Sequence, residues 1–150
     1  MGTIFISAGH YLNEPGASSF AKTTEAQEMM QTRDLIVQEL KSMGLKDGQD
    51  FVTVPDDLDL SPTINWINSR ATSGDIALEI HGNAFDGSVR GTECFYLDGN
   101  DERKGNAELI LNSLLQQVPE LTNRGVKPDT LTHVGKLAFC RQVTIPSLLL

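Results

Sequence analysis

The stretch DIALEIH, residues 75–81, sets a short apolar run directly before a histidine. Glycines bound this stretch on both sides, at Gly74 and Gly82. A mostly apolar run of this length between turn-forming residues is typical of a strand buried on both faces of a sheet. Residues 3–7, TIFIS, form a second such run, and His10 follows shortly after it. We therefore predict two buried strands, each with a histidine at or just past its carboxyl end.

Segments with helical spacing alternate with these strands. Thr24 is a good N-cap before an acidic first turn, and the apolar residues after it recur at helical spacing until Gly44. Ser61-Pro62 has the pattern of an N-cap followed by proline at the first helical position. The expected elements are a helix over 24–43, a strand over 51–54, a helix over 63–72, a strand over 76–81, a strand over 91–97 and a helix over 101–118. This alternation predicts a single three-layer α/β domain with a mostly parallel twisted sheet and helices on both faces.

Composition and charge exclude several kinds of partner and site. The chain has 12 Lys and Arg against 20 Asp and Glu, and its formal charge of −8 opposes sequence-independent binding to nucleic acid. No apolar stretch is long enough to cross a bilayer, and the N-terminus lacks the pattern of a secretory signal, so we expect no membrane partner. Cys94 and Cys140 lack C-x-x-C spacing and are expected to pack as small apolar residues. We expect a monomer.

Three residues far apart in the sequence are expected to meet at one edge of the sheet. In open α/β sheets the functional site lies outside the carboxyl ends of the strands, where His10 and His81 are predicted. Glu25 is in the first turn of the helix that follows the His10 loop. Each residue alone has an ordinary explanation, as a hydrogen-bonded or surface histidine or as a helix-dipole partner. Together they form a His/His/carboxylate set, which is typical of a catalytic zinc site that leaves one position for water.

Further polar residues are predicted near this edge. Strand alternation puts Glu79 on the same face as His81, and we expect a buried carboxylate that is hydrogen-bonded to the loops or orients a metal ligand, rather than a catalytic group. Asn83 is expected to hold the turn after His81 or to bind a peptide carbonyl. His133 is expected either to contact substrate or to be solvated. Glu28, one helical turn after Glu25, is an alternative metal ligand.

The order of these motifs resembles the zinc-dependent N-acetylmuramoyl-L-alanine amidases, the family of many phage endolysins and bacterial autolysins. The resemblance covers nearly the whole chain and includes a final core strand. It is carried by ISAGH at residues 6–10, TE at 24–25, RATSGD at 70–75 leading to EIHGNA at 79–84, GTECFY at 91–96, NRGVK at 123–127 and IPSLLL at 145–150.

The resemblance implies an activity, a substrate and a cofactor. The reaction would be hydrolysis of the amide between the lactyl group of N-acetylmuramic acid and the first L-alanine of the peptidoglycan stem peptide. His10, Glu25 and His81 would be the ligands of Zn²⁺, which would polarise the carbonyl and supply the nucleophilic water. A protein with this activity acts on the cell wall after release or secretion.

The sequence departs from the family at its end. The resemblance implies a general acid/base glutamate directly after the last core strand, a position that lies beyond Leu150. Because three leucines at the end of a strand need covering, we expect that residues 1–150 are a zinc amidase catalytic domain that lacks its C-terminal end. Loss of general acid/base catalysis typically costs about 10²–10⁴-fold in rate. Two other functions therefore stay open: a cell-wall-binding or regulatory module that retains the metal cleft without turnover, and a zinc peptidase of another specificity.

Overall fold

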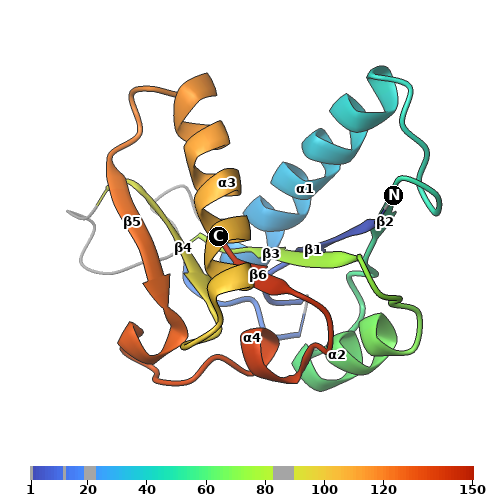
Figure 1. Cartoon of the computed structure of the whole chain (residues 1–150). Helices are drawn as coiled ribbons and strands as arrows, with labels where there is room; N and C mark the ends of the chain where they lie inside the picture. Colours follow the sequence, from blue (N-terminus) through green and yellow to red (C-terminus); the bar gives the residue numbers. More distant parts are fainter. Residues whose placement is uncertain (1, 12, 19–22, 83–89) are drawn as a thin grey trace.

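The computed structural model describes residues 2–11, 13–18, 23–82 and 90–150. Within these ranges a six-stranded sheet forms the centre of the domain, in the order β2-β1-β3-β6-β4-β5 (Figure 1). The strands are β1 (Ile4–Ala8), β2 (Phe51–Thr53), β3 (Ile76–Ile80), β4 (Thr92–Tyr96), β5 (Asn123–Pro128) and β6 (Ser147–Leu149). The helices are α1 (Glu25–Ser42), α2 (Leu60–Asn68), α3 (Asp101–Gln117), the 3-10 helix η1 (Asp129–Leu131) and α4 (Ala138–Gln142).

The sheet is mostly parallel, as predicted. β1 pairs in parallel with β2 and β3, and β3 pairs in parallel with β6. β4 runs antiparallel to β6 and parallel to β5, which lies at the edge. Because β4 is reversed, it begins at the edge of the sheet where β1, β3 and β6 end.

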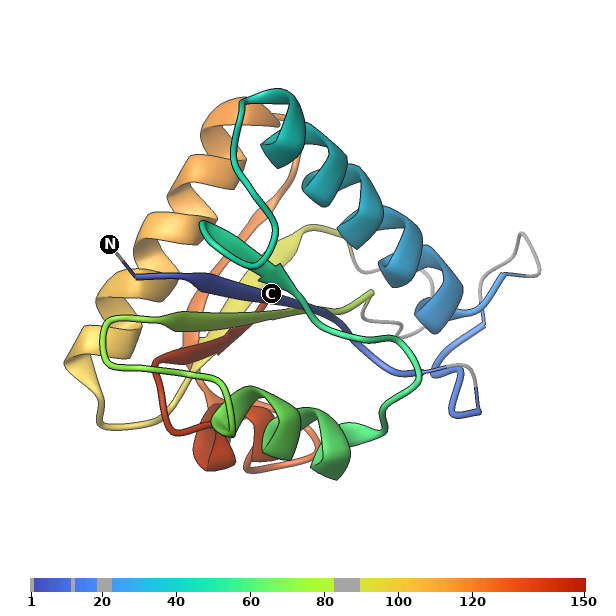
Figure 2. The ribbon, with the colours of Figure 1, turned by 90° about the vertical axis from the view of Figure 1, so that its right-hand side faces the viewer.

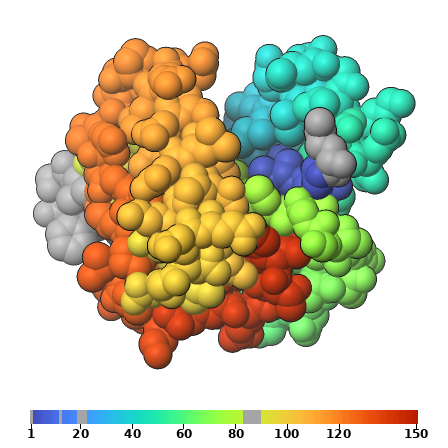
Figure 3. Space-filling view, viewed as in Figure 1, coloured from blue at the N-terminus to red at the C-terminus, as the bar shows by residue number. Residues whose placement is uncertain are grey.

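Helices cover both faces of the sheet. α1 and α3 lie on one side, and α2 and α4 lie on the other, which gives the three predicted layers (Figures 1 and 2). On the first face, Leu111 of α3 belongs to the same buried cluster as Leu78 of β3. On the second face, Ile67 of α2 and Phe139 of α4 cluster with Phe5 of β1. In the space-filling view α1 and α3 form separate ridges whose outer ends diverge (Figure 3).

β1 illustrates why the central strands carry apolar residues on both faces. Phe5 belongs to the cluster beneath α2 and α4, whereas the next residue, Ile6, clusters with Val37 of α1 and Phe51 of β2. Successive side chains point to opposite faces of a strand, and here both faces are covered by helices. The apolar run in the sequence is therefore a direct consequence of the three-layer arrangement.

The start of α2 differs from its prediction. The helix begins at Leu60 and its N-cap is Asp59, whose Oδ1 accepts the Leu60 N–H at 2.6 Å, so the expectation of Ser61 as N-cap is wrong. Pro62 then falls within the first helical turn, where the backbone N–H has no helical acceptor and its loss costs little. The helix ends at Asn68, four residues before the predicted end.

β5 and α4 have no counterpart in the predicted strands and helices, and neither does the three-residue 3-10 helix η1. β5, NRGVKP, is an edge strand whose residues are half-buried or exposed, so it shows no apolar alternation. α4 has five residues, too few to show a helical period. Both depend on tertiary contacts rather than on a pattern that can be read along the chain.

The two cysteines are fully buried on opposite faces of the sheet. Cys94 clusters with Leu111 of α3, and Cys140 clusters with Phe95 and Leu149. Burial raises the pKa of each thiol to about 12. The prediction that they pack as small apolar residues is confirmed. None of the helices in the described part of the chain has the length and apolarity that a bilayer span requires.

Candidate metal centre

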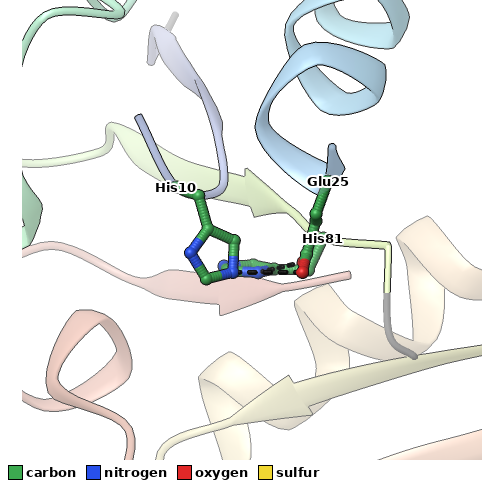
Figure 4. Close-up of side chains that lie close together, drawn as sticks. All are labelled: His10, Glu25 and His81. Carbon is green, nitrogen blue, oxygen red and sulfur yellow. Dashed lines mark hydrogen bonds and ion pairs between the residues drawn. The ribbon is translucent and has the colours of Figure 1, made fainter. Parts of the chain in front are cut away.

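Three side chains from distant segments meet at the carboxyl edge of the sheet (Figure 4). His10 lies just after β1, Glu25 is the first residue of α1, and His81 follows β3. Nε2 of His10 lies 3.2 Å from Oε2 of Glu25, and Nδ1 of His81 lies 3.0 Å from Oε1 of Glu25. One potential ligand atom from each residue lies within 4.8 Å of the others. The structure thus brings together the three residues that the sequence predicts as ligands.

The start of α1 and two backbone segments hold the Glu25 carboxylate. Thr24 caps the helix in a capping box, and the Glu25 oxygens accept N–H bonds from Ala17 at 3.3 Å and Gly82 at 3.1 Å. Burial raises the pKa of Glu25, but the hydrogen bond with His81, the charges of both histidines and the Ala17 N–H outweigh burial. The pKa of this carboxyl therefore lies below its ordinary value, and Glu25 is a carboxylate that is only 8% exposed.

The His81 ring lies between two carboxylates. Its Nδ1 faces Glu25, and its Nε2 lies 2.9 Å from Oε1 of Glu79. Burial lowers the pKa of the ring, but the hydrogen bonds and charges of Glu25 and Glu79 outweigh this effect and raise the pKa to about 9. Near neutral pH each ring N–H therefore donates to a carboxylate. Metal ligands must be deprotonated, so a cation among the three donors would take the place of the Nδ1 proton.

The backbone of His10 has a conformation that side chains rarely adopt. Its φ is 64°, in the left-handed region, where histidine is several-fold enriched over most other non-glycine residues. The ring lies edge to face against His81, with centroids 5.1 Å apart and an interplanar angle of 78°. Residues held in such backbone regions cluster at ligand-binding and active sites. The conformation of His10 is thus consistent with a functional constraint on this turn.

Two glycines lie so close to the three side chains that a Cβ at either position would overlap them. A Cβ on Gly9 would lie 2.5–2.6 Å from three atoms of the His81 ring. A Cβ on Gly16, whose φ is +70°, would lie 2.7 Å from Cδ2 of His10 and 2.8 Å from Oε2 of Glu25. Any side chain at either position would push a candidate ligand aside. The role of Gly16 could not be anticipated from the sequence, because many glycines occur in loops of this kind.

The donor set fits a zinc ion. Imidazole nitrogen and carboxylate oxygen bind Zn²⁺ at about 2.0–2.2 Å, so two donors on a tetrahedral ion lie roughly 3.4 Å apart. The two histidine–carboxylate distances of 3.2 and 3.0 Å are close to this spacing. Three protein donors would leave a fourth position for water or substrate. The chemistry of the donors and the space kept by the two glycines therefore agree with a catalytic metal site.

A pocket of about 210 Å³ adjoins the three residues. His10, His81 and Glu79 line one part of it, and apolar side chains from the α2 and α4 side, including Leu58 and Phe139, line another. Small-molecule sites typically combine an apolar wall with a few converging polar groups. The pocket therefore provides a cleft in which a substrate can reach the candidate metal ligands.

The other residues predicted near the site differ in whether the structure places them beside the three candidate ligands. Asn83 lies outside the described residues. His133 is exposed between η1 and α4 and is not among the described residues that line the pocket, so its contact with substrate stays a prediction. Glu28 is outside the three-residue cluster. Glu79 is buried, as predicted, and contacts His81, and its orienting role stays a prediction.

The structure therefore places a His/His/carboxylate set, a donor set that can bind a divalent cation, at the carboxyl edge of a mostly parallel α/β sheet. The chain belongs to the N-acetylmuramoyl-L-alanine amidase family, whose sequence profile matches residues 4–150. This membership confirms the family resemblance seen in the sequence motifs.

Solved structures of amidases share the fold. The N-acetylmuramoyl-L-alanine amidase from Clostridium difficile 630 is 22% identical, with a TM-score of 0.80 over 99% of this chain and 77% of that chain. The CwlD amidase from Clostridioides difficile, solved in complex with the GerS lipoprotein, is 24% identical, with a TM-score of 0.78 over 99% of this chain and 80% of that chain. AmiC2 of Nostoc punctiforme is 21% identical, with a TM-score of 0.75 over 98% and 77%. A search of curated proteins gave no match.

Proposed function

We propose that this protein is a monomeric, zinc-dependent enzyme that cleaves the amide between N-acetylmuramic acid and L-alanine in peptidoglycan. The observation that carries the proposal is the cluster of His10, Glu25 and His81 beside a pocket, in a chain of the amidase family. The enzyme would act at the cell wall, where this substrate occurs. The acidic chain opposes electrostatic attraction to an anionic wall, so recognition would depend on the pocket.

The residues of the site have separate parts in this chemistry. His10, Glu25 and His81 would hold the zinc ion, which when bound polarises a carbonyl and lowers the pKa of a water molecule. The Glu25 carboxylate offsets part of the cation's charge. The apolar wall around Leu58 and Phe139 would exclude water from one side of the scissile amide, which strengthens the electrostatic interactions within the pocket.

The chain directly after β6 is hydrogen-bonded to the backbone of the segment that carries Glu79 and His81. The His81 N–H donates to the Leu150 carbonyl at 2.8 Å, and the Leu150 N–H donates to the Glu79 carbonyl at 2.9 Å. Leu150 therefore lies beside the candidate ligands.

Incubation with purified peptidoglycan tests the proposal. We expect release of stem peptides with a free L-alanine amine, identified by mass spectrometry, and loss of this release on chelation with recovery on addition of Zn²⁺. New amino termini at other residues would instead identify a peptidase of different specificity. Sedimentation with the wall without release of peptides, in both the presence and the absence of Zn²⁺, would identify a wall-binding module.

Replacement of Gly9 by alanine tests the space around His81. The added methyl must displace a ring that both Glu25 and Glu79 hold, and a displacement of about 1 Å at a reacting site can cost about 10²-fold in rate. We expect weaker Zn²⁺ binding in a calorimetric titration and a loss of hydrolysis of that order. The matched control is Gly105→Ala in α3, where a Cβ meets no atom within 4 Å and alanine favours the helix. Equal behaviour of the two variants would contradict the role of Gly9.

A further inference from the structure

Glu79 is a carboxylate in the middle of the sheet. It lies on β3 between two neighbouring strands, paired with Ser7 of β1 and Leu149 of β6, and it is 6% exposed. Burial of a charged carboxylate is costly unless hydrogen bonds or an opposite charge compensate it. An apolar residue at this position would pack beside Leu149 without that cost. The presence of Glu79 therefore requires a reason other than the stability of the sheet.

The contacts of Glu79 point toward the metal centre. Its Oε1 lies 2.9 Å from Nε2 of His81, and its Oε2 faces the hydroxyl of Ser7 at 3.5 Å. On the other side of the ring, Nδ1 of His81 lies 3.0 Å from Glu25, which in turn meets His10 at 3.2 Å. A continuous chain of polar contacts thus runs from β1 through Glu79 and His81 to the other two candidate ligands.

A carboxylate at this position selects one form of the imidazole. A neutral imidazole has one N–H donor and one acceptor nitrogen, whereas a carboxylate only accepts. Glu79 therefore favours the tautomer with the proton on Nε2, which leaves the lone pair on Nδ1. Nδ1 is the atom that faces Glu25, so a cation among the three donors that replaced the Nδ1 proton would meet this lone pair. Metal-binding histidines commonly donate their second N–H to a carboxylate in this way.

We propose that Glu79 is a positioning residue that holds the His81 ring in the Nε2–H tautomer, with Nδ1 directed at the metal. This inference rests on the proposed zinc-dependent function and adds to it a residue that acts through His81. A direct role as general base fits the geometry less well, because the Glu79 oxygen nearest the ring is engaged by His81. His81 directly follows β3 and is two residues after Glu79, so the backbone at the end of this strand sets the distance between the two side chains.

The variant Glu79→Gln tests the proposal because glutamine has the same shape but can also donate a hydrogen bond. We expect Zn²⁺ binding to weaken by about 10–100-fold, measured by competition with a chelating indicator. In two-dimensional ¹H–¹⁵N NMR of the zinc-loaded protein, His81 should show the Nε2–H tautomer in the wild type and a mixture or the other form in Glu79→Gln. Glu79→Ala, which removes the acceptor, should weaken binding at least as much.

The matched control is Glu93→Gln on β4. Glu93 is a buried carboxylate as well, 7% exposed, but its ion pairs are with Arg124 and Lys127 of β5. We expect this variant to lose stability in urea while zinc affinity and the His81 tautomer stay as in the wild type. An equal loss of zinc affinity in Glu79→Gln and Glu93→Gln would show a general structural effect and overturn the positioning role.

The remaining outcomes separate the two proposals. If the wild type releases stem peptides with zinc and Glu79→Gln keeps the wild-type zinc affinity and tautomer, the positioning role is wrong and the amidase function stands. If the wild type binds no zinc in the same titration, the proposed zinc dependence fails, and the positioning role fails with it.

Discussion

Glu25→Gln is expected to reduce hydrolysis about a thousandfold or more, because a bound metal ion contributes several kcal/mol of transition-state stabilisation. The substitution keeps the shape of the side chain but removes the negative charge that both histidines face. Glu25 is proposed to bind the ion directly. Glu25→Gln should therefore weaken Zn²⁺ binding by more than the roughly 10–100-fold expected for a residue such as Glu79, which acts through a ligand. Calorimetric titration with Zn²⁺ and the peptide-release assay measure the two effects.

Two glutamates of the same helix serve as controls for Glu25. Glu39→Gln changes an exposed carboxylate of α1 and should leave both zinc affinity and hydrolysis unchanged. Glu28→Gln tests the alternative ligand; because Glu28 lies outside the three-residue cluster, we expect wild-type zinc affinity. Wild-type affinity in Glu25→Gln together with a large loss in Glu28→Gln would contradict the proposed ligand set.

Asp129→Ala is expected to lower the free energy of unfolding by about 3–5 kcal/mol, because it removes the acceptor of four hydrogen bonds and a bond to a charged group typically contributes about 1.5–3 kcal/mol. Asp129 is 0% exposed. It accepts two bonds from the Arg141 guanidinium, at 2.6 and 3.0 Å, and backbone N–H bonds from Asp98 and Leu137 at 3.1 Å each. It thereby ties the loop after β4 to η1 and to the start of α4. A loss of this size is a large fraction of the 5–15 kcal/mol stability typical of a domain.

The contribution of Asp129 should depend on pH. Burial raises the pKa of this carboxyl, but the bonds from Arg141, Asp98 and Leu137 outweigh burial, so its pKa lies below the ordinary value. A carboxylate whose pKa is lower in the folded state stabilises the fold at pH above its unfolded pKa, about 3.9. This stabilisation is lost as pH falls through the folded pKa. The difference between wild type and Asp129→Asn should therefore be full at pH 7 and shrink below about pH 4.

Urea unfolding at pH 7 and at pH 3 measures both predictions for Asp129. The control is Asp57→Asn, an exposed aspartate that should change stability by less than about 0.5 kcal/mol. A difference between wild type and Asp129→Asn that stays constant with pH would show that the carboxylate does not make the stabilising contribution assigned to it. Zinc affinity of Asp129→Asn should match the wild type, because the three candidate ligands belong to other segments.

The elements with a strong apolar period were predictable from the sequence. β1, β3, α1 and α3 lie within one or two residues of their predicted ranges. Each packs along its length against other elements, so its buried residues recur with the period of the strand or helix. α2 was placed less well because its N-cap is Asp59, two residues before the predicted cap Ser61, and the start of the helix depends on the path of the preceding loop. β5 and α4 carried no such pattern, since one is a half-buried edge strand and the other a single short turn.

The three candidate ligands could be named from the sequence because each follows a predictable element. His10 and His81 come after buried strands, and Glu25 begins a capped helix, so the rule for the carboxyl edge of a parallel sheet puts them together. The loop around Gly16 and the buried anchor Asp129 could not be found in this way. Their contacts are with residues distant in the chain, and the local sequence around each one is ordinary for a loop.

The sequence by itself determined the alternation of strands and helices, the layers they form and the edge where the polar residues collect, because these follow from periodicity among near neighbours in the chain. The tertiary structure alone decided which atoms meet at that edge: one Glu25 oxygen against each imidazole, and Glu79 on the far nitrogen of His81. It also decided that Asp129 is fully buried. Such distances of about 3 Å depend on the relative positions of β1, β3 and α1, which are set by packing between segments and not by the order of residues within them.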